Sequence, residues 1–140
     1  DSIRHTGSVI IGAIAIWSAW RLHKRVQGKQ VGPYLLYAIL LVAYIALLIR
    51  FGQFPAERLH LLEYGFMGVL LLRARTIDRP ARVQDFVICW GLTVLIGCGD
   101  ETIQWVLPQR YFELKDVGLN AVSCALGLCL SRLVTGGQQQ

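Results

Sequence analysis

Charged residues are scarce in this sequence of 140 residues, because Asp, Glu, Lys and Arg together make up only 16% of it. A soluble globular domain carries about 25% charged residues, which cover its surface in water. The shortage argues against a water-soluble globule, a disordered tail and a DNA-binding module, although the formal net charge is +5. Hydrophobic residues make up 54% of the chain and its mean hydropathy is +0.48, so lipid is the expected solvent.

Common catalytic and metal-binding patterns are also missing. The four cysteines lie inside apolar runs without the close pairing or His spacing of a metal site, and they are expected to be buried reduced thiols. The sequence has no H-E-x-x-H motif, no G-x-S-x-G motif and no phosphate-binding glycine loop. We therefore expect no catalytic residues, no metal and no cofactor.

Long apolar runs without strict alternation favour helices over strands. A membrane-spanning helix needs roughly 20 mostly apolar residues. No small-x-small cleavage pattern follows the first run, which is interpreted as a helix rather than a signal peptide. We expect an all-α polytopic membrane helix bundle of about five transmembrane helices, forming a single membrane domain over residues 1–140. The five expected helices cover residues 6–22, 33–49, 58–72, 86–106 and 116–133.

Basic residues predict the orientation of this bundle, because Lys and Arg gather in cytoplasmic loops. The first and third connections each contain four of them, whereas the second and fourth contain two each, offset by acids. The chain is therefore expected to begin outside and to end in the cytoplasm. The basic residues of the two cytoplasmic connections are Arg21, Lys24, Arg25 and Lys29, and Arg73, Arg75, Arg79 and Arg82.

This topology brings polar residues from three helices to the outer membrane interface. A charged side chain at mid-bilayer costs roughly 2.5 to 3.5 kcal/mol on insertion scales, so acids in helices of this kind turn inward and find partners. Arg110 is expected to fold back over Asp100 or Glu101, since its guanidinium can hold a carboxylate with two hydrogen bonds. The expected ligand-binding or structural residues, called here the polar cluster, are His60, Glu63, Tyr64, Asp100, Glu101, Gln104, Arg110, Asp116 and Asn120.

Some of these residues also have a simpler interpretation. His60, Glu63 and Tyr64 could only close hydrogen bonds within the bundle, and Asp116 stands where it could be the N-cap of the fifth helix. The four tryptophans are expected to be interface anchors. The adjacent acids at residues 100–101 are harder to explain by structure alone, because one acid would cap or pair as well as two.

The motifs of the polar cluster resemble those of the VanZ-like family of small integral membrane proteins. The similar segments are HLLEYGFMG at residues 60–68, DETIQ at residues 100–104, Pro108 with Arg110, and Asp116 with Asn120. The resemblance covers about residues 35–130, and the chain departs from the family at Gln109, Ser123 and residues 56–58. The family takes its name from a member associated with low-level resistance to teicoplanin, a glycopeptide antibiotic, and most members have no assigned reaction. The resemblance therefore implies a fold and a bacterial inner (cytoplasmic) membrane location more than an activity.

Four functions remain open, of which a transporter is the weakest because the sequence shows no inverted repeats. The favoured one is a non-catalytic protein of the cell envelope whose outward acidic pocket binds a lipid head group, a cell-wall precursor or a glycopeptide antibiotic. The second is a structural accessory subunit of a larger membrane complex. The third is a hydrolase of lipid-linked substrates, in which His60 and the acids supply a general base or metal ligands. The expected partners are membrane lipid, other membrane subunits and a precursor or glycopeptide, but not nucleic acid.

Overall fold

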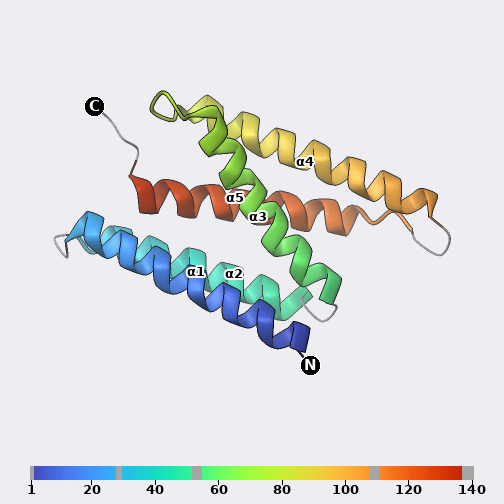
Figure 1. Ribbon diagram of the computed structural model, residues 1–140, viewed down its shortest axis with the longest axis horizontal. Helices are drawn as coiled ribbons and strands as arrows, with labels where there is room; N and C mark the ends of the chain where they lie inside the picture. The colour runs from blue at the N-terminus through green and yellow to red at the C-terminus, as the bar shows by residue number, and fades with distance from the viewer. Residues whose placement is uncertain (1, 28–29, 52–54, 108–110, 137–140) are drawn as a thin grey trace. The chain divides into compact units, whose positions relative to one another are not determined.

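The structure is a computed structural model that describes residues 2–27, 30–51, 55–107 and 111–136. Within these ranges it contains five α-helices and no strand, which confirms the prediction of an all-α protein with about five long helices (Figure 1). The helices are α1 (Ser2–Val26), α2 (Gly32–Phe51), α3 (Pro55–Arg75), α4 (Val83–Val106) and α5 (Leu114–Thr135).

Three of the described helices, α2, α4 and α5, are long and apolar enough to cross a membrane. None of the residues of α2 is fully buried within the chain, and Leu35, Ile39, Val42 and Ile49 are each more than half exposed. All five helices extend beyond the ranges expected from apolar length alone. For example, α1 continues to Val26 through a basic last turn, which interacts favourably with the partial negative charge at the C-terminal end of a helix.

The chain divides into two compact units, which are described separately: residues 1–59 with 129–140, and residues 60–128. In the first unit, polar side chains join α1 to α2. The Tyr37 hydroxyl donates a hydrogen bond to the Ala15 carbonyl (2.6 Å) and lies 3.1 Å from the Ser18 hydroxyl. A second contact joins His23 of α1 to Tyr34 of α2. His23 Nδ1 lies 3.1 Å from the Tyr34 hydroxyl. Polar side-chain contacts of this kind are typical of packed membrane helices.

The end of α5 belongs to the same unit and closes on a glycine. Gly136 has a φ of +62°, in the left-handed region that glycine adopts without a steric penalty, and its N–H donates to the Arg132 carbonyl (3.1 Å). The Arg25 guanidinium donates a hydrogen bond to the carbonyl of Leu133, one of the last carbonyls of the helix. A Cβ atom at residue 136 would lie 2.5 Å from Arg25 Nε, so this end of the unit also needs a residue without a side chain.

In the second unit, small residues let α3, α4 and α5 approach one another closely. A Cβ atom on Gly127 of α5 would lie 2.5 Å from the Gly65 carbonyl oxygen of α3. A Cβ atom on Gly68 would lie 2.5 Å from Cys124 Sγ. Trp90, expected only as an interface anchor, also joins α4 to α5 by donating to the Ala121 carbonyl (2.9 Å). The core beside these contacts consists of Leu72, Cys89, Cys124 and Leu128.

The expectation that all cysteines are buried is only partly right. All four are free thiols, and Cys89 and Cys124 are buried in the core. Cys98 is half-buried and Cys129 is exposed. An apolar run in a membrane helix has a face toward lipid as well as a face toward protein, so lying in such a run does not bury a thiol within the chain.

Substituting Gly127 with Ala should destabilise the second unit, because the added methyl group collides with the backbone of α3 rather than with a flexible side chain. Overpacking of this kind costs about 1 to 3 kcal/mol, which should lower the thermal unfolding midpoint of the protein in detergent. The matched control is Gly118→Ala on the same helix, where nothing lies within 4 Å of the new atom. Equal midpoints for the two variants would contradict the close contact.

Candidate functional site

The first part of the polar cluster joins α3 to α4. The rings of His60 and Tyr64, one turn apart on α3, stack with their centroids 5.8 Å apart and an angle of 18° between their planes. The hydroxyl of Tyr64 donates a hydrogen bond to Asp100 Oδ2 of α4 (3.4 Å). Gln104, one turn further along α4, donates from Nε2 to the same oxygen (3.0 Å). The structure therefore brings four of the expected residues into one chain of contacts.

The second part of the polar cluster is buried between α4 and α5. Glu101 is 2% exposed, and its Oε2 accepts a hydrogen bond from the backbone N–H of Glu113 (3.2 Å). Asn120 is 1% exposed, and its Nδ2 lies 3.2 Å from the position of a Cβ atom on Gly97. The same position is 3.2 Å from Tyr64 Cε1. Gly97 therefore lets the asparagine and the tyrosine reach the same point beside α4.

Four atoms in this cluster are buried without a hydrogen-bond partner, and no other side-chain atom of the described residues shares that condition. They are Nδ1 of His60, Oε1 of Glu101, and both Oδ1 and Nδ2 of Asn120. The large majority of buried side-chain polar atoms in proteins have a hydrogen-bond partner, and leaving one unsatisfied costs about 1 to 3 kcal/mol. Among the described residues, the unsatisfied polar atoms therefore gather at three members of the polar cluster.

The remaining members of the polar cluster are Glu63, Asp116 and Arg110. Glu63 is exposed, whereas Tyr64 beside it is buried. Asp116 lies in the first turn of α5, which begins at Leu114, so it is not the N-cap that the sequence suggested. Its Oδ1 lies 4.0 Å from Lys115 Nζ, and an acid in a first turn is stabilised by the helix dipole. Arg110 lies outside the described residues, so its contact with Asp100 or Glu101 stays a prediction.

Within the described part of the chain, no three His, Cys, Asp or Glu side chains lie close enough together to hold a metal ion. The side chains of the cluster offer both donors and acceptors of hydrogen bonds. Carboxylate and amide oxygens accept, the Asn120 amide nitrogen also donates, and His60 Nδ1 does either according to its tautomer.

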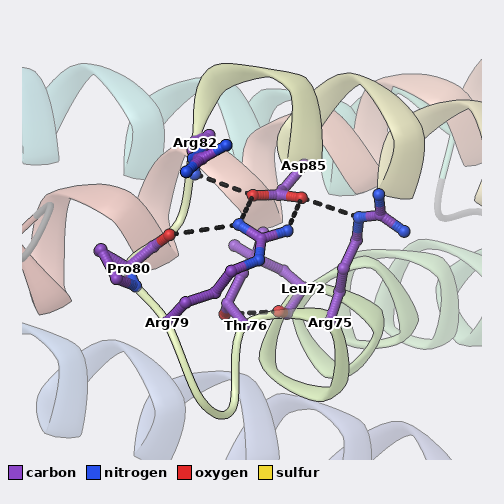
Figure 2. Close-up of polar contacts among 7 residues, drawn as sticks. All are labelled: Leu72, Arg75, Thr76, Arg79, Pro80, Arg82 and Asp85. Carbon is purple, nitrogen blue, oxygen red and sulfur yellow. Dashed lines mark hydrogen bonds and ion pairs between the residues drawn. The ribbon is translucent and has the colours of Figure 1, made fainter.

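A second polar site, which sequence reasoning missed, surrounds Asp85 in the first turn of α4 (Figure 2). Asp85 is 2% exposed and its two oxygens accept four hydrogen bonds. Oδ1 accepts from Arg75 Nε (2.8 Å) and Arg79 Nη2 (2.7 Å). Oδ2 accepts from Arg79 Nη1 (2.7 Å) and from the backbone N–H of Arg82 (2.9 Å). The carboxylate therefore fixes the turn between α3 and α4.

In the sequence these arginines stand out only as orientation signals, and nothing there predicts the contact of their side chains with Asp85. Asp85 stands three residues after Arg82, the spacing at which an acid accepts a hydrogen bond from the N-cap backbone. That spacing could have identified the hydrogen bond from the Arg82 N–H to Asp85. The arginine contacts depend on the path of the turn, which the spacing does not reveal. The hydrogen bond to Asp85 raises the pKa of Arg79 above its usual value, so this ion pair persists at high pH.

Comparison with known proteins places both polar sites inside one family match. A family model described as VanZ/LLP1 matches residues 53–135, which contain α3, α4 and α5 but neither α1 nor α2. The match begins later than residue 35, where the sequence resemblance was expected to start. No curated protein and no solved structure matches the chain.

Substituting Asp85 with Asn should lower the thermal unfolding midpoint of the detergent-solubilised protein by several degrees. The amide keeps the size of the side chain, but it cannot accept all four hydrogen bonds or balance two guanidinium charges. The matched control is Asp78→Asn, an exposed acid in the same turn, which should leave the midpoint unchanged. A similar effect of both substitutions would show that only the net charge of the turn matters.

Substituting Asn120 with Leu should stabilise the ligand-free protein in detergent. It removes two buried polar atoms that have no partner, each of which costs about 1 to 3 kcal/mol, and it keeps the number and branching of the side-chain heavy atoms. The matched control is Ser123→Ala one turn along α5, which removes a buried hydroxyl that donates to the Leu61 carbonyl and should therefore destabilise the protein. A lower unfolding midpoint for Asn120→Leu would show that the amide already has a partner within the protein.

Proposed function

Since the chain belongs to the VanZ/LLP1 family, we propose that it is a non-catalytic membrane protein of the cell envelope whose polar cluster binds a polar ligand. The observation that carries this proposal is the set of four buried, unpartnered atoms on His60, Glu101 and Asn120. A ligand that forms hydrogen bonds with these atoms would offset the free-energy cost of burying them unsatisfied. Binding sites commonly give up stability in this way, because the groups that recognise a ligand are unsatisfied without it.

The ligand is expected to bring hydrogen-bond donors. Two of the four unpartnered atoms, Glu101 Oε1 and Asn120 Oδ1, are acceptors, and His60 Nδ1 also accepts in one tautomer. Asp100, next to Glu101 in the sequence, is a second carboxylate. Ammonium, amide and hydroxyl groups supply such donors. The head group of a lipid, a cell-wall precursor and a glycopeptide antibiotic all carry groups of this kind, and these are the candidate ligands.

The proposed location is the outer face of a bacterial cytoplasmic membrane, with the N-terminus outside and the C-terminus in the cytoplasm. The charge distribution along α4 supports this orientation. Arg79 and Arg82 precede its first residue, whereas Asp100 and Glu101 lie near its last turns. Basic residues favour the cytoplasmic side, so the acids would face outward, where precursors and antibiotics are found.

The contacts of His60 favour binding over catalysis. A serine or cysteine nucleophile needs a base within hydrogen-bond reach. In the described part of the chain the His60 ring stacks on Tyr64, and its Nδ1 has no hydrogen-bond partner. The buried hydroxyl of Ser123 donates to the Leu61 carbonyl, so it is held by the backbone instead of by a base.

The test uses the purified full chain in detergent and two separate probes, teicoplanin and phosphatidylethanolamine. We expect one of them to raise the unfolding midpoint of the wild type. Glu101→Gln should bind that probe at least about tenfold more weakly, which corresponds to about 1.4 kcal/mol. The matched control is Glu113→Gln, because Glu113 contacts Glu101 through its backbone N–H, which the substitution keeps.

Two results would overturn the proposal. One is equal binding of the probe by the Glu101→Gln variant and the wild type. The other is a wild type that binds neither probe and that detergent extracts from native membranes only as part of a larger complex. In the second case the accessory-subunit hypothesis would replace it, with the polar cluster serving to hold three helices together.

A further inference from the structure

The turn between α3 and α4 presents guanidinium groups that Asp85 holds in place without using all their donors. A carboxylate has about four acceptor positions, and those of Asp85 are all occupied. Arg75 uses only its Nε–H, and its two terminal nitrogens point away from the carboxylate (Figure 2). The side chains of Arg75 and Arg79 are 43% and 39% exposed, so their unused N–H groups are accessible from outside.

Positive charge is in excess around this turn. Residues 73–85 contain four arginines and two aspartates, a net charge of +2. The single buried acid neutralises only one of the two guanidinium groups that it holds. The other two arginines, Arg73 and Arg82, are exposed. An anion that approaches the turn therefore meets an attractive field and donors that are already positioned.

Apolar side chains surround the same charges. Ile77, in the turn itself, is 79% exposed, and Val83 and Val87 on the first two turns of α4 are also exposed. α4 is one of the helices long and apolar enough to cross a membrane, and it begins at Val83. Exposed aliphatic groups next to arginines at the start of such a helix are typical of a surface that lies at the boundary between lipid head groups and acyl chains.

We propose that the α3–α4 turn is a binding site for the phosphate group of an anionic phospholipid, held by Arg75 and Arg79. The two terminal nitrogens of Arg75, which Asp85 leaves free, can donate two parallel hydrogen bonds to the oxygens of a phosphate. Arg79, whose terminal nitrogens both donate to Asp85, adds its positive charge and its remaining N–H groups. Asp85 acts as a positioning residue, because it immobilises both side chains before the lipid arrives and so reduces the entropy lost on binding. The exposed aliphatic side chains then contact the first carbons of the acyl chains.

This site is independent of the proposed ligand of the polar cluster. Asp85 and Asp100 are 15 residues apart on α4, a separation of about 22 Å along the helix axis. The two sites therefore lie toward opposite membrane faces, and each can fail without the other.

The experiment measures how strongly the full chain retains phosphatidylglycerol in competition with phosphatidylcholine, by native mass spectrometry from mixed micelles. We expect the wild type to retain phosphatidylglycerol preferentially. Asp85→Asn makes the turn more positive by one charge but releases the arginines. If the site is built as proposed, this variant loses about tenfold in preference, equivalent to the loss of one charge-assisted hydrogen bond. A stronger preference than the wild type would show diffuse electrostatic attraction and would overturn the proposal.

Arg75→Lys decides the same question if Asp85→Asn fails to fold. It keeps the charge and removes the guanidinium fork, so we expect a similar loss, and an unchanged preference would contradict a built site. The matched control is Arg73→Gln, which removes a charge from the same turn at a residue for which no contact with Asp85 is found. This variant should largely keep the preference for phosphatidylglycerol. Glu101→Gln should also keep it, which separates this proposal from the previous one.

A final arm distinguishes the source of the phosphate. Inorganic phosphate and glycerol phosphate are added to the wild type while it holds phosphatidylglycerol. We expect neither to displace the lipid at concentrations similar to that of the lipid, because they lack acyl chains for the exposed aliphatic residues. Displacement by either would assign the site to a soluble phosphate and overturn the lipid assignment.

Discussion

The close approach of α3 and α5 is the contact on which the rest of the second unit depends. Gly127 meets the backbone at Gly65, and the hydroxyl of Ser123 bonds to a carbonyl of α3 one turn earlier. With the two helices this close, Asn120 and Tyr64 both come to lie against Gly97 of α4. The small residues therefore do more than allow packing, because they determine which polar side chains are buried and which are left to lipid or water.

The two buried acids of α4 differ in how fully their carboxylates are hydrogen-bonded. Asp85 has two cations and a backbone N–H, and its acceptor positions are filled by the chain itself. Glu101 is equally inaccessible, yet one of its oxygens has a single backbone donor and the other has none. A saturated acid stabilises a fold, whereas a half-satisfied acid costs stability and is retained where it has another use. This difference is why we treat Glu101 as part of a binding site and Asp85 as a positioning residue.

Apolar length was enough to predict the five helices. Helical spacing predicted that His60 and Tyr64 share one face of α3 and that Asp100 and Gln104 share one face of α4. Spacing could not decide which of Glu63 and Tyr64 is buried, because neighbouring positions on a helix both fit a broad polar face. The contacts of α3 with α5 fix the rotation of α3 about its axis and so bury Tyr64. It also could not reveal the arginines around Asp85, since the chain reverses between them and pattern alone does not give the path of a turn. The sequence identified which residues are polar within apolar helices, and tertiary contacts decided which of them are satisfied.

The ion pairs of the α3–α4 turn also bear on how the chain enters the bilayer. Arg75 and Arg79 precede Asp85, so both cations have already left the ribosome when the acid emerges. The carboxylate can be neutralised as soon as α4 starts to form, before that helix partitions from the translocon into hydrocarbon. α3 and α4 can therefore be joined at their turn by charges that are close in the sequence, before contacts between more distant residues form.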